Sequence, residues 1–314
     1  MPMPLFALPS IRQDTNRTTW PAETLGRAPY KPFLLLTVLD LMDAGRIAEN
    51  RIVPDEDLTD AFMLYWNAIL PDRLRPSIHL PFFYLRTDGF WTLHPVPGKT
   101  LPETEPSSWK NVQERYAFAS LDEGFFDHLK DPQKRATARL NLIRRSFIPA
   151  LEKPLLDLAN TQLSAFEYAD KLLRPPPALY EKPVEKPARD QAFRRVIVKV
   201  YDHRCALCGI RIISPDSRTV VDAAHIKDWA VSHDDSPTNG LALCKLCHWT
   251  FDIGLVGFDD DYRVIVARSI TRDGNLPGHI QQFARRPMIM PERECYYPAT
   301  DNLAWHRQRF KLGC

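Results

Sequence analysis

The sequence has no strong excess of charge of either sign and no long hydrophobic run. Its 41 Lys and Arg residues against 39 Asp and Glu residues give a net charge of +2 over 314 residues. A strongly basic chain would indicate nucleic-acid binding over its whole surface, so any such contact here must come from local patches. No apolar run reaches the roughly 18 residues that a membrane-spanning helix needs. We therefore expect no membrane partner.

The first ten residues, MPMPLFALPS, carry no basic residue, so we expect a mobile leader there rather than a secretory signal peptide. A cytoplasmic location is the expectation. The chain has only six cysteines, and in a reducing compartment thiols act as metal ligands or stay free rather than form disulfides. Cys295 and Cys314 lie apart from the others and are expected to be free thiols.

The composition, 44% apolar and 25% charged, is that of an ordinary globular protein, and the length suggests about two domains. No internal repeat is present. The proline-rich segment RPPPALYEKPVEKPARD at Arg174–Asp190 predicts a semi-rigid spacer. We expect a mostly helical domain with a β-hairpin over residues 1–173 and a second domain over residues 191–314, which makes the fold class α+β.

Four of the cysteines form two CxxC pairs, and these organise the second domain. Cys205 and Cys208 make the first pair, and Cys244 and Cys247 make the second. Four thiolates in two such pairs are the ligand set of a closed, tetrahedral structural Zn²⁺ site. The 35-residue gap between the pairs is longer than in a simple zinc ribbon, so an inserted segment must carry further structure.

Around the second pair stand a His, an Asn and a His in an order that resembles the HNH nuclease family. The resemblance implies a ββα-metal fold in which His225 is the general base, Asn239 orients it, and His248 on the following helix binds a divalent metal. The segments that match the family are DAAHI, NGLALC and CHWTFD, at Asp222–Ile226, Asn239–Cys244 and Cys247–Asp252.

One position departs from the family pattern. Many members carry an Asp or His ligand directly before the base, whereas Ala224 stands there in this chain. Asp222 and Asp252 are the two candidates for the missing metal ligand. Asp252 lies four residues after His248, so both would face one side of a helix. The His and carboxylate set suits several divalent ions, including Mg²⁺ and Mn²⁺.

These residue types fit phosphodiester hydrolysis independently of the resemblance. A neutral imidazole can accept a proton from water near neutral pH, and a bound cation neutralises charge on the phosphate and the leaving oxygen. The structural zinc would anchor a motif that has too little apolar surface to fold firmly alone. A different interpretation is also open, namely a non-catalytic zinc-knuckle regulator that binds nucleic acid.

The first domain is predicted to centre on a buried helix over Arg27–Ala44, apolar on nearly every side and stopped by Gly45. A second helix is predicted over Pro54–Leu70 from its helical spacing. The aromatic-rich segment His79–His94, with Asp88-Gly89 in its middle, predicts a strand, a turn and a second strand.

This part of the chain resembles the N-terminal sulfur-binding domain of phosphorothioate-dependent HNH restriction endonucleases. In those proteins, basic and aromatic residues around RAPHKP-like and YPF-like motifs form an apolar pocket for the backbone sulfur. Tyr30 replaces a His of the family motif, and Leu80 replaces a Tyr. The positions that the resemblance assigns to DNA binding are Arg27, Tyr30, Lys31, Pro81 and Phe82.

Helices are predicted over Ser120–Leu173, over Gln191–Tyr201 and near the C-terminus, and a strand is predicted after Asp259–Asp261. One basic helix around Leu140 presents either a solvated face or a surface for the DNA backbone. Its basic residues are Lys134, Arg135, Arg139, Arg144 and Arg145.

Together these patterns predict a restriction-type, metal-dependent endonuclease used in defence, which cuts double-stranded DNA. The first domain would direct it to modified DNA, with phosphorothioated DNA as one candidate, or would instead sense a protein or a small ligand. A homodimer is expected if the product is a double-strand break, because cutting both strands requires two active sites.

Overall fold

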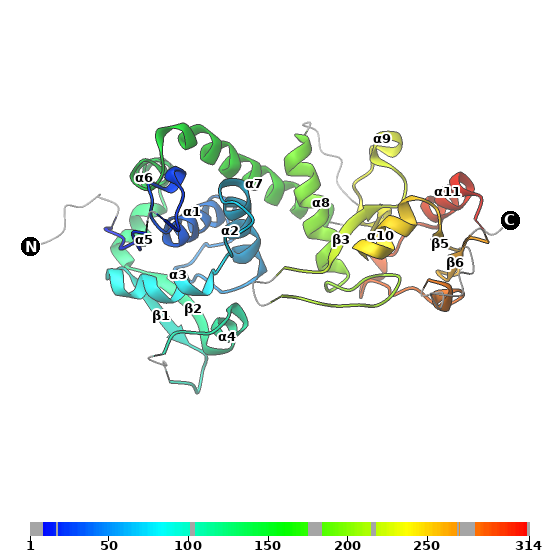
Figure 1. Cartoon of the computed structure of the whole chain (residues 1–314), viewed down its shortest axis with the longest axis horizontal. Helices are drawn as coiled ribbons and strands as arrows, with labels where there is room; N and C mark the ends of the chain where they lie inside the picture. Colours follow the sequence, from blue (N-terminus) through cyan, green and yellow to red (C-terminus); the bar gives the residue numbers. More distant parts are fainter. Residues whose placement is uncertain are drawn as a thin grey trace, which may run out of the picture. The chain divides into compact units, whose positions relative to one another are not determined.

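The computed structural model describes residues 9–16, 18–100, 104–174, 184–214, 218–268, 270 and 280–312. These residues pack as two compact units, one up to Leu163 and the other from Ser164 onward (Figure 1). The boundary between the units falls inside helix α7 (Glu152–Leu172). In the described part of the chain, no helix is long and apolar enough to cross a membrane.

The first unit is built around α1 (Tyr30–Asp43), which confirms the helix predicted over Arg27–Ala44. Eleven of its fourteen residues are buried, and it packs against α2, α3 and α6 (Figure 1). Gly45 has a φ of +69°, the left-handed conformation that ends a helix at low cost in glycine. The helices of this unit are α1, α2 (Glu56–Ile69), α3 (His79–Tyr84), α4 (Trp109–Arg115), α5 (Glu123–Leu129), α6 (Pro132–Ser146) and the first part of α7.

The hairpin predicted over His79–His94 is wrong. Its first half is the short helix α3, and its second half is strand β1 (Trp91–Pro95). The antiparallel partner of β1 is β2 (Tyr116–Leu121), which lies more than twenty residues further along the chain. Phe82 and Phe83 favour a strand by propensity, but both are buried on the helix, so tertiary packing overrides that propensity.

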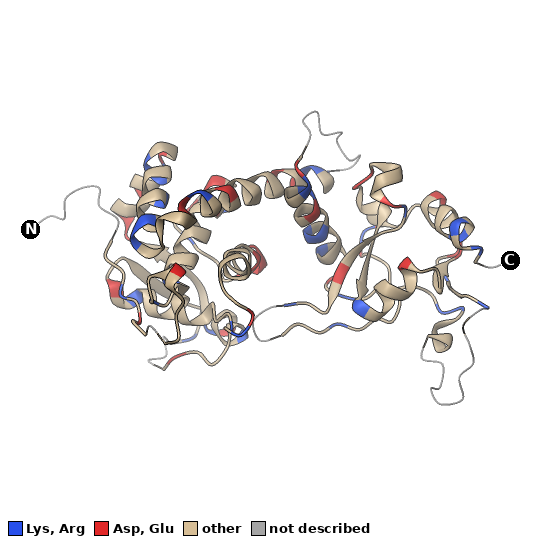
Figure 2. Ribbon diagram, turned by 45° about the horizontal axis from the view of Figure 1, so that its top comes forward, with Lys and Arg blue, Asp and Glu red and all other residues tan. Residues whose placement is uncertain are grey.

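The basic helix α6 is neither wholly solvated nor wholly free for DNA. Arg135 and Arg139 are buried and paired with acids of α1. Arg139 Nη2 lies 2.9 Å from Asp40 Oδ1 and 2.6 Å from Asp43 Oδ2. Both interpretations of the charge pattern were therefore wrong for these two arginines, which tie α6 to the central helix. Lys and Arg residues stand among Asp and Glu residues over both units (Figure 2).

The predicted spacer coincides only in part with what the structure describes. Residues 175–183 lie outside the described residues. Helix α8 begins at Lys186, five residues before the predicted start at Gln191, and ends at Val200. The start of α8 packs into the second unit instead of forming a spacer, because Ala188 and Arg189 are already buried.

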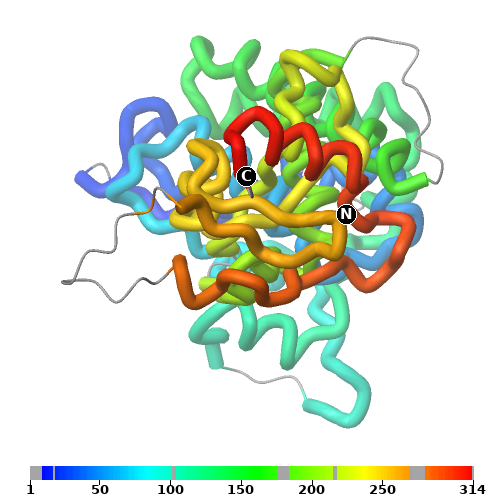
Figure 3. Tube along the Cα trace, turned by 90° about the vertical axis from the view of Figure 1, so that its right-hand side faces the viewer, coloured from blue at the N-terminus to red at the C-terminus, as the bar shows by residue number. Residues whose placement is uncertain are grey.

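The second unit packs two small hairpins and three helices around one core. Val221, Leu241 and Phe251 lie in this core together with Ile197 of α8. Helix α11 (Thr300–Phe310) confirms the predicted C-terminal helix and packs on β5 (Figure 3). The other elements are β3 (Val221–His225), α9 (Trp229–Ser232), β4 (Gly240–Cys244), α10 (Lys245–Asp252), β5 (Val256–Phe258) and β6 (Val264–Val266).

Candidate active site and metal centre

The candidate site stands on two antiparallel strands and the helix that follows them. Strands β3 and β4 pair with His225 opposite Gly240, and α10 begins directly after Cys244. A side chain at Gly240 would collide with α8, since an added Cβ would lie 2.3 Å from Ile197 and 2.9 Å from Phe193. Glycine therefore allows α8 to pack closely on this end of the hairpin.

The four cysteines come together as the sequence predicts. The Sγ atoms of Cys205, Cys208, Cys244 and Cys247 lie within 4.8 Å of one another, and those of Cys208 and Cys244 are 3.8 Å apart. A tetrahedral ion with Zn–S bonds of about 2.3 Å places its sulfur atoms roughly 3.8 Å apart, so the cluster fits such an ion. Gly209, at a φ of +76°, closes the turn of the first pair.

The cluster joins the two ends of the motif. The backbone N–H of Ala206 donates to Ala242 of β4 at 2.7 Å, so the first cysteine pair is bonded to the hairpin. The second pair spans the junction of β4 and α10. Hydrogen bonding from the Cys208 thiol lowers the pKa of Cys205. Cys295 is exposed and free, and Cys314 lies outside the described residues.

His225 stands at the end of β3 with its ring held on two sides. Its Nε2 lies 2.8 Å from Oδ1 of Asp235, and its ring stacks on Phe193 with centroids 3.8 Å apart at 7°. The side chain is 21% exposed, so part of the imidazole remains open to solvent. These contacts leave a histidine that is oriented yet accessible, as a general base must be.

Asn239 is fully buried, and its side chain closes the loop between the two strands. Its Oδ1 accepts from the Lys227 backbone at 2.9 Å, and its Nδ2 donates to the carbonyls of Lys227 and Asp234 at 3.0 and 2.9 Å. Among the described contacts the Asn239 amide does not meet the His225 ring. The backbone carbonyl of Asn239 accepts from the backbone N–H of Ile226, the residue that follows His225.

Sequence reasoning missed Asp235, which is the direct partner of His225. The only signal was the acidic pair Asp234-Asp235 ahead of Ser236-Pro237 in the loop before Asn239. Nothing in that spacing distinguishes a carboxylate that turns inward from one that stays in solvent. The structure separates them, since the Asp235 side chain is 2% exposed.

His248 and Asp252 lie together on one face of α10, as their spacing predicts. His248 Nε2 is 3.5 Å from Asp252 Oδ2, and both side chains are partly exposed. Two neighbouring ligands of an octahedral ion with bonds of about 2.1 Å lie roughly 3 Å apart, so this pair fits two positions of one cation. Asp222 instead accepts a hydrogen bond from Arg194 of α8 at 3.0 Å. Within the described residues, the cysteine cluster is the one group of three or more metal-ligating side chains.

Three of the five predicted DNA-binding residues, Arg27, Tyr30 and Lys31, lie where α1 begins. Tyr30 stacks on Trp66 and meets the edge of Trp20, and its hydroxyl donates to the carbonyl of Arg75. Burial raises the pKa of the Tyr30 phenol. Lys31 forms an ion pair of 2.6 Å with Asp88 and is 11% exposed, so its charge is already partnered.

The remaining predicted residues of this group lie at different depths. Pro81 is buried on α3, which packs against α1. Phe82 is 0% exposed and meets Trp91 and Trp109 edge to face, so its ring belongs to the core. Arg27 is exposed and, with Arg145, lines a polar cavity of about 50 Å³.

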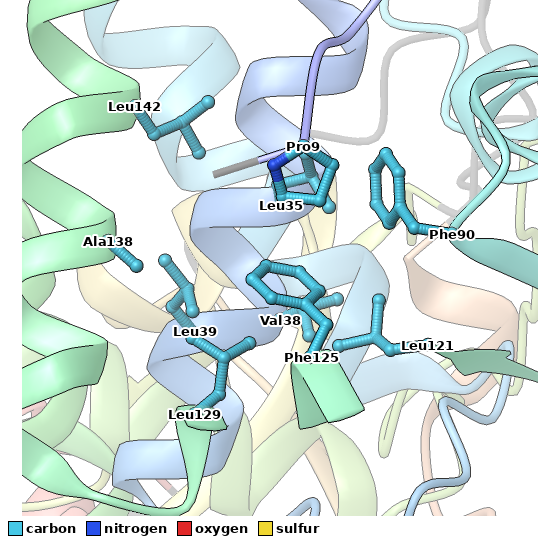
Figure 4. Close-up of a pocket in the computed structure, with 10 residues that line it drawn as sticks. All are labelled: Pro9, Leu35, Val38, Leu39, Phe90, Leu121, Phe125, Leu129, Ala138 and Leu142. Carbon is cyan, nitrogen blue, oxygen red and sulfur yellow. The ribbon is translucent and has the colours of Figure 1, made fainter. Parts of the chain in front are cut away.

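An apolar gap lies on another side of the first unit (Figure 4). Figure 4 shows Phe125 and Leu129 of α5 facing α1, with Ala138 and Leu142 of α6 beside them. Its volume of about 10 Å³ is at the lower limit for one water molecule, and an apolar gap of that size stays empty. None of the predicted DNA-binding residues lines it, so we interpret it as a packing gap.

A hairpin and helix joined by four cysteines, with a histidine on the strand and another on the helix, define the ββα-metal class of nuclease domains. Residues 205–259 match the family model of HNH endonucleases. Residues 18–160 match the ScoMcrA-like DNA sulfur-binding domain. The chain therefore contains both an HNH endonuclease domain and a DNA sulfur-binding domain.

Two solved structures with partial likeness are both restriction endonucleases. The modification-dependent TagI restriction endonuclease is 25% identical, with a TM-score of 0.30 and 40% of each chain covered. The Type IV phosphorothioation-dependent restriction endonuclease ScoMcrA is 13% identical, with a TM-score of 0.32, covering 76% of this chain and 92% of that one. The chain thus spans 40% of the TagI enzyme's length. No curated protein matches it.

Proposed function

We propose that this protein is a metal-dependent DNA endonuclease of the restriction type. Residues 1–173 act as the recognition domain and residues 191–314 as the nuclease domain. One observation carries the proposal: His225 and His248 stand on a hairpin and helix that a four-cysteine cluster joins. The same chain matches a DNA sulfur-binding domain, which gives the nuclease a means of choosing its substrate.

His225 is the general base of the proposed reaction. Its imidazole accepts a proton from water as that water attacks phosphorus in line with the leaving oxygen. The contacts with Asp235 and Phe193 support this role, because they fix the ring before substrate binds. Asn239 holds the loop that carries Asp235 and Lys227, and so supports the base indirectly, without touching its ring.

His248 and Asp252 would hold the divalent ion, Mg²⁺ or Mn²⁺, with further ligands from water and the DNA phosphate. The 3.5 Å between their ligand atoms supports Asp252 over Asp222, which is paired with Arg194. Bound there, the ion supplies charge neutralisation at the phosphate and at the leaving oxygen. The four cysteines would hold a structural Zn²⁺.

The substrate of the proposed enzyme is double-stranded DNA that carries a modification, with a phosphorothioate backbone as the first candidate. The domain match over residues 18–160 supports this choice. Arg27 and Tyr30 are the accessible members of the predicted contact set, whereas Lys31 is paired with Asp88 and Pro81 and Phe82 are buried. A homodimer would place two active sites on the duplex if both strands are cut.

A cleavage assay on three duplexes of one sequence tests this function. The duplexes are unmodified, cytosine-methylated or phosphorothioated, and each is incubated without added metal, with Mg²⁺ and with Mn²⁺. The zinc content of the protein is measured in every sample, so that loss of the structural ion is not mistaken for loss of the catalytic one. We expect metal-dependent cutting of the phosphorothioated duplex alone.

Other outcomes separate the two halves of the proposal. Cutting of the methylated or unmodified duplex would keep the nuclease and remove the sulfur specificity. Failure to cut any duplex in either metal, by protein that retains its zinc, would contradict the nuclease function and favour a non-catalytic DNA-binding protein.

A further inference from the structure

Asp235 reaches His225 from inside the domain. Its Oδ1 lies 2.8 Å from His225 Nε2, and Asp235 as a whole is only 4% exposed. An ionised carboxylate can only accept hydrogen bonds, so the imidazole nitrogen that faces it carries the proton. The neutral ring then has its lone pair on Nδ1, and Nδ1 is the atom that can take a proton from water.

We propose that Asp235 is a positioning residue that fixes His225 in the Nε2–H tautomer and leaves Nδ1 as the base. The inference rests on the proposed nuclease function and adds a residue to its machinery. Asp235 itself does not touch the reacting atoms. It acts by holding the ring, and by favouring the positively charged ring that forms when Nδ1 takes the proton.

The second oxygen of Asp235 is held as firmly as the first. Tyr168 of α7 donates its hydroxyl to Oδ2 at 3.0 Å. Burial, followed by the nearby Asp235 charge, raises the pKa of Tyr168 well above its usual range, so this hydroxyl stays a donor. Arg189 of α8 places its Nε 3.7 Å from the same oxygen and lays its guanidinium over Trp229. The carboxylate therefore has little freedom to rotate.

The ring of His225 is also fixed across its face. Phe193 of α8 stacks on its face at 3.8 Å, while Asp235 bonds its edge, so these two contacts define its orientation. Tyr168, Arg189 and Phe193 all precede residue 205, where the match to the HNH family model begins. The orientation of the base thus depends on α7 and α8, outside the hairpin and helix of the motif.

Asp235→Asn tests the proposal with almost no change in shape. Tyr168 donates its hydroxyl to the Oδ2 position and the Arg189 guanidinium lies 3.7 Å from it, so the new amide is expected to keep its oxygen there. Its NH₂ group then faces His225 and donates to Nε2, which moves the ring proton to Nδ1 and blocks the base. We expect kcat for cleavage to fall about 10²- to 10⁴-fold, because the ring can no longer act as the base. KM for the duplex should stay unchanged, because the buried Asp235 does not reach DNA.

The tautomer is measured directly by ¹⁵N NMR of the whole protein labelled at histidine, with the His225 signals assigned from a His225→Gln sample. Wild type should show a protonated Nε2 and an unprotonated Nδ1, and Asp235→Asn should show the reverse. Asp202→Asn is the matched control, since it removes one carboxylate from an exposed ion pair with Arg211. It should leave both the kinetics and the His225 signals unchanged.

The outcomes separate this inference from the proposed function. A lower kcat with constant KM and a reversed tautomer supports the positioning role. If wild type cuts DNA and Asp235→Asn cuts equally well, or if wild type carries its proton on Nδ1, the positioning role is overturned while the nuclease function stands. If wild type cuts no duplex in any metal, both are overturned together.

Discussion

We expect substitution of Arg139 to lower the stability of the first unit strongly. Its guanidinium bridges Asp40 and Asp43 of α1 and is 9% exposed. Asp40 also accepts from Tyr65 at 2.6 Å and from Gln162 at 3.1 Å, so four helices share one carboxylate. Arg139→Ala would leave a buried charge without its cation, which costs roughly 3–5 kcal/mol.

The cost should depend on pH, because the buried carboxyl can escape by taking a proton. Burial already raises the pKa of Asp40 to about 6 with Arg139 present. Without that cation the proton is bound more tightly. The variant should therefore lose less stability at pH 5, where Asp40 is protonated, than at pH 8. At pH 8 the folded variant must either keep Asp40 protonated or hold a buried carboxylate without its cation.

Hydrogen exchange of the α1 amides during urea titration measures the free energy of unfolding of this unit alone, which matters in a chain with two units. Arg144→Ala is the matched control, because Arg144 lies on the same helix in an exposed pair with Glu152. Solvent screens such an exposed pair, so its loss should change the stability little. Equal losses in the two variants, at either pH, would refute the assignment of a buried network.

Two predictions concern the second unit. Burial lowers the pKa of His306 from 6.5 to about 4, so the folded state resists its protonation and stability falls as the pH drops from about 6.5 to 4; the full effect is at most about 3 kcal/mol. His306→Gln should flatten this dependence in the hydrogen exchange of α11, and an unchanged slope would count against it. Cys247→Ser should release the metal and expose the amides of α10, whereas Cys295→Ser, outside the cluster, should retain metal content and protection. Retention of a full equivalent of zinc by Cys247→Ser would exclude the four-cysteine site.

The sequence predicts the metal cluster and the order of the site because these depend on short spacings. Each CxxC pair places its two thiolates on one turn. His248 and Asp252, four residues apart, share one face of a helix. The central helix α1 was also predictable. An element that is apolar on nearly every side has to be buried, whatever surrounds it.

What the sequence does not predict are partners that come from distant segments. The strand partner of β1 is not the neighbouring aromatic run but β2, and the aromatic run folds as α3 around the buried Phe82. Arg139 pairs with Asp40 of α1, ninety-nine residues away in the sequence. Charge and propensity are local quantities, so neither could identify these pairs.

Asp235 could not be predicted for the same reason, because its partners also come from distant segments. Its chemistry comes from Tyr168 and Arg189, which converge on it from α7 and α8. In the sequence it is one acid in a polar loop. Only the fold shows that it points inward to His225, and that Asn239 closes the loop rather than meeting the ring.

The role of His225 as the base is tested most directly by the cleavage rate of His225→Ala at saturating metal, measured on whichever duplex the wild type cuts. We expect the rate to fall about 10²- to 10⁴-fold with DNA binding and zinc content unchanged, since a general base contributes about that much. His203→Asn, a histidine of the same unit at a positive φ that Asn tolerates, should cut like wild type. A His225→Ala protein that cuts at the wild-type rate would show that His225 is not the base.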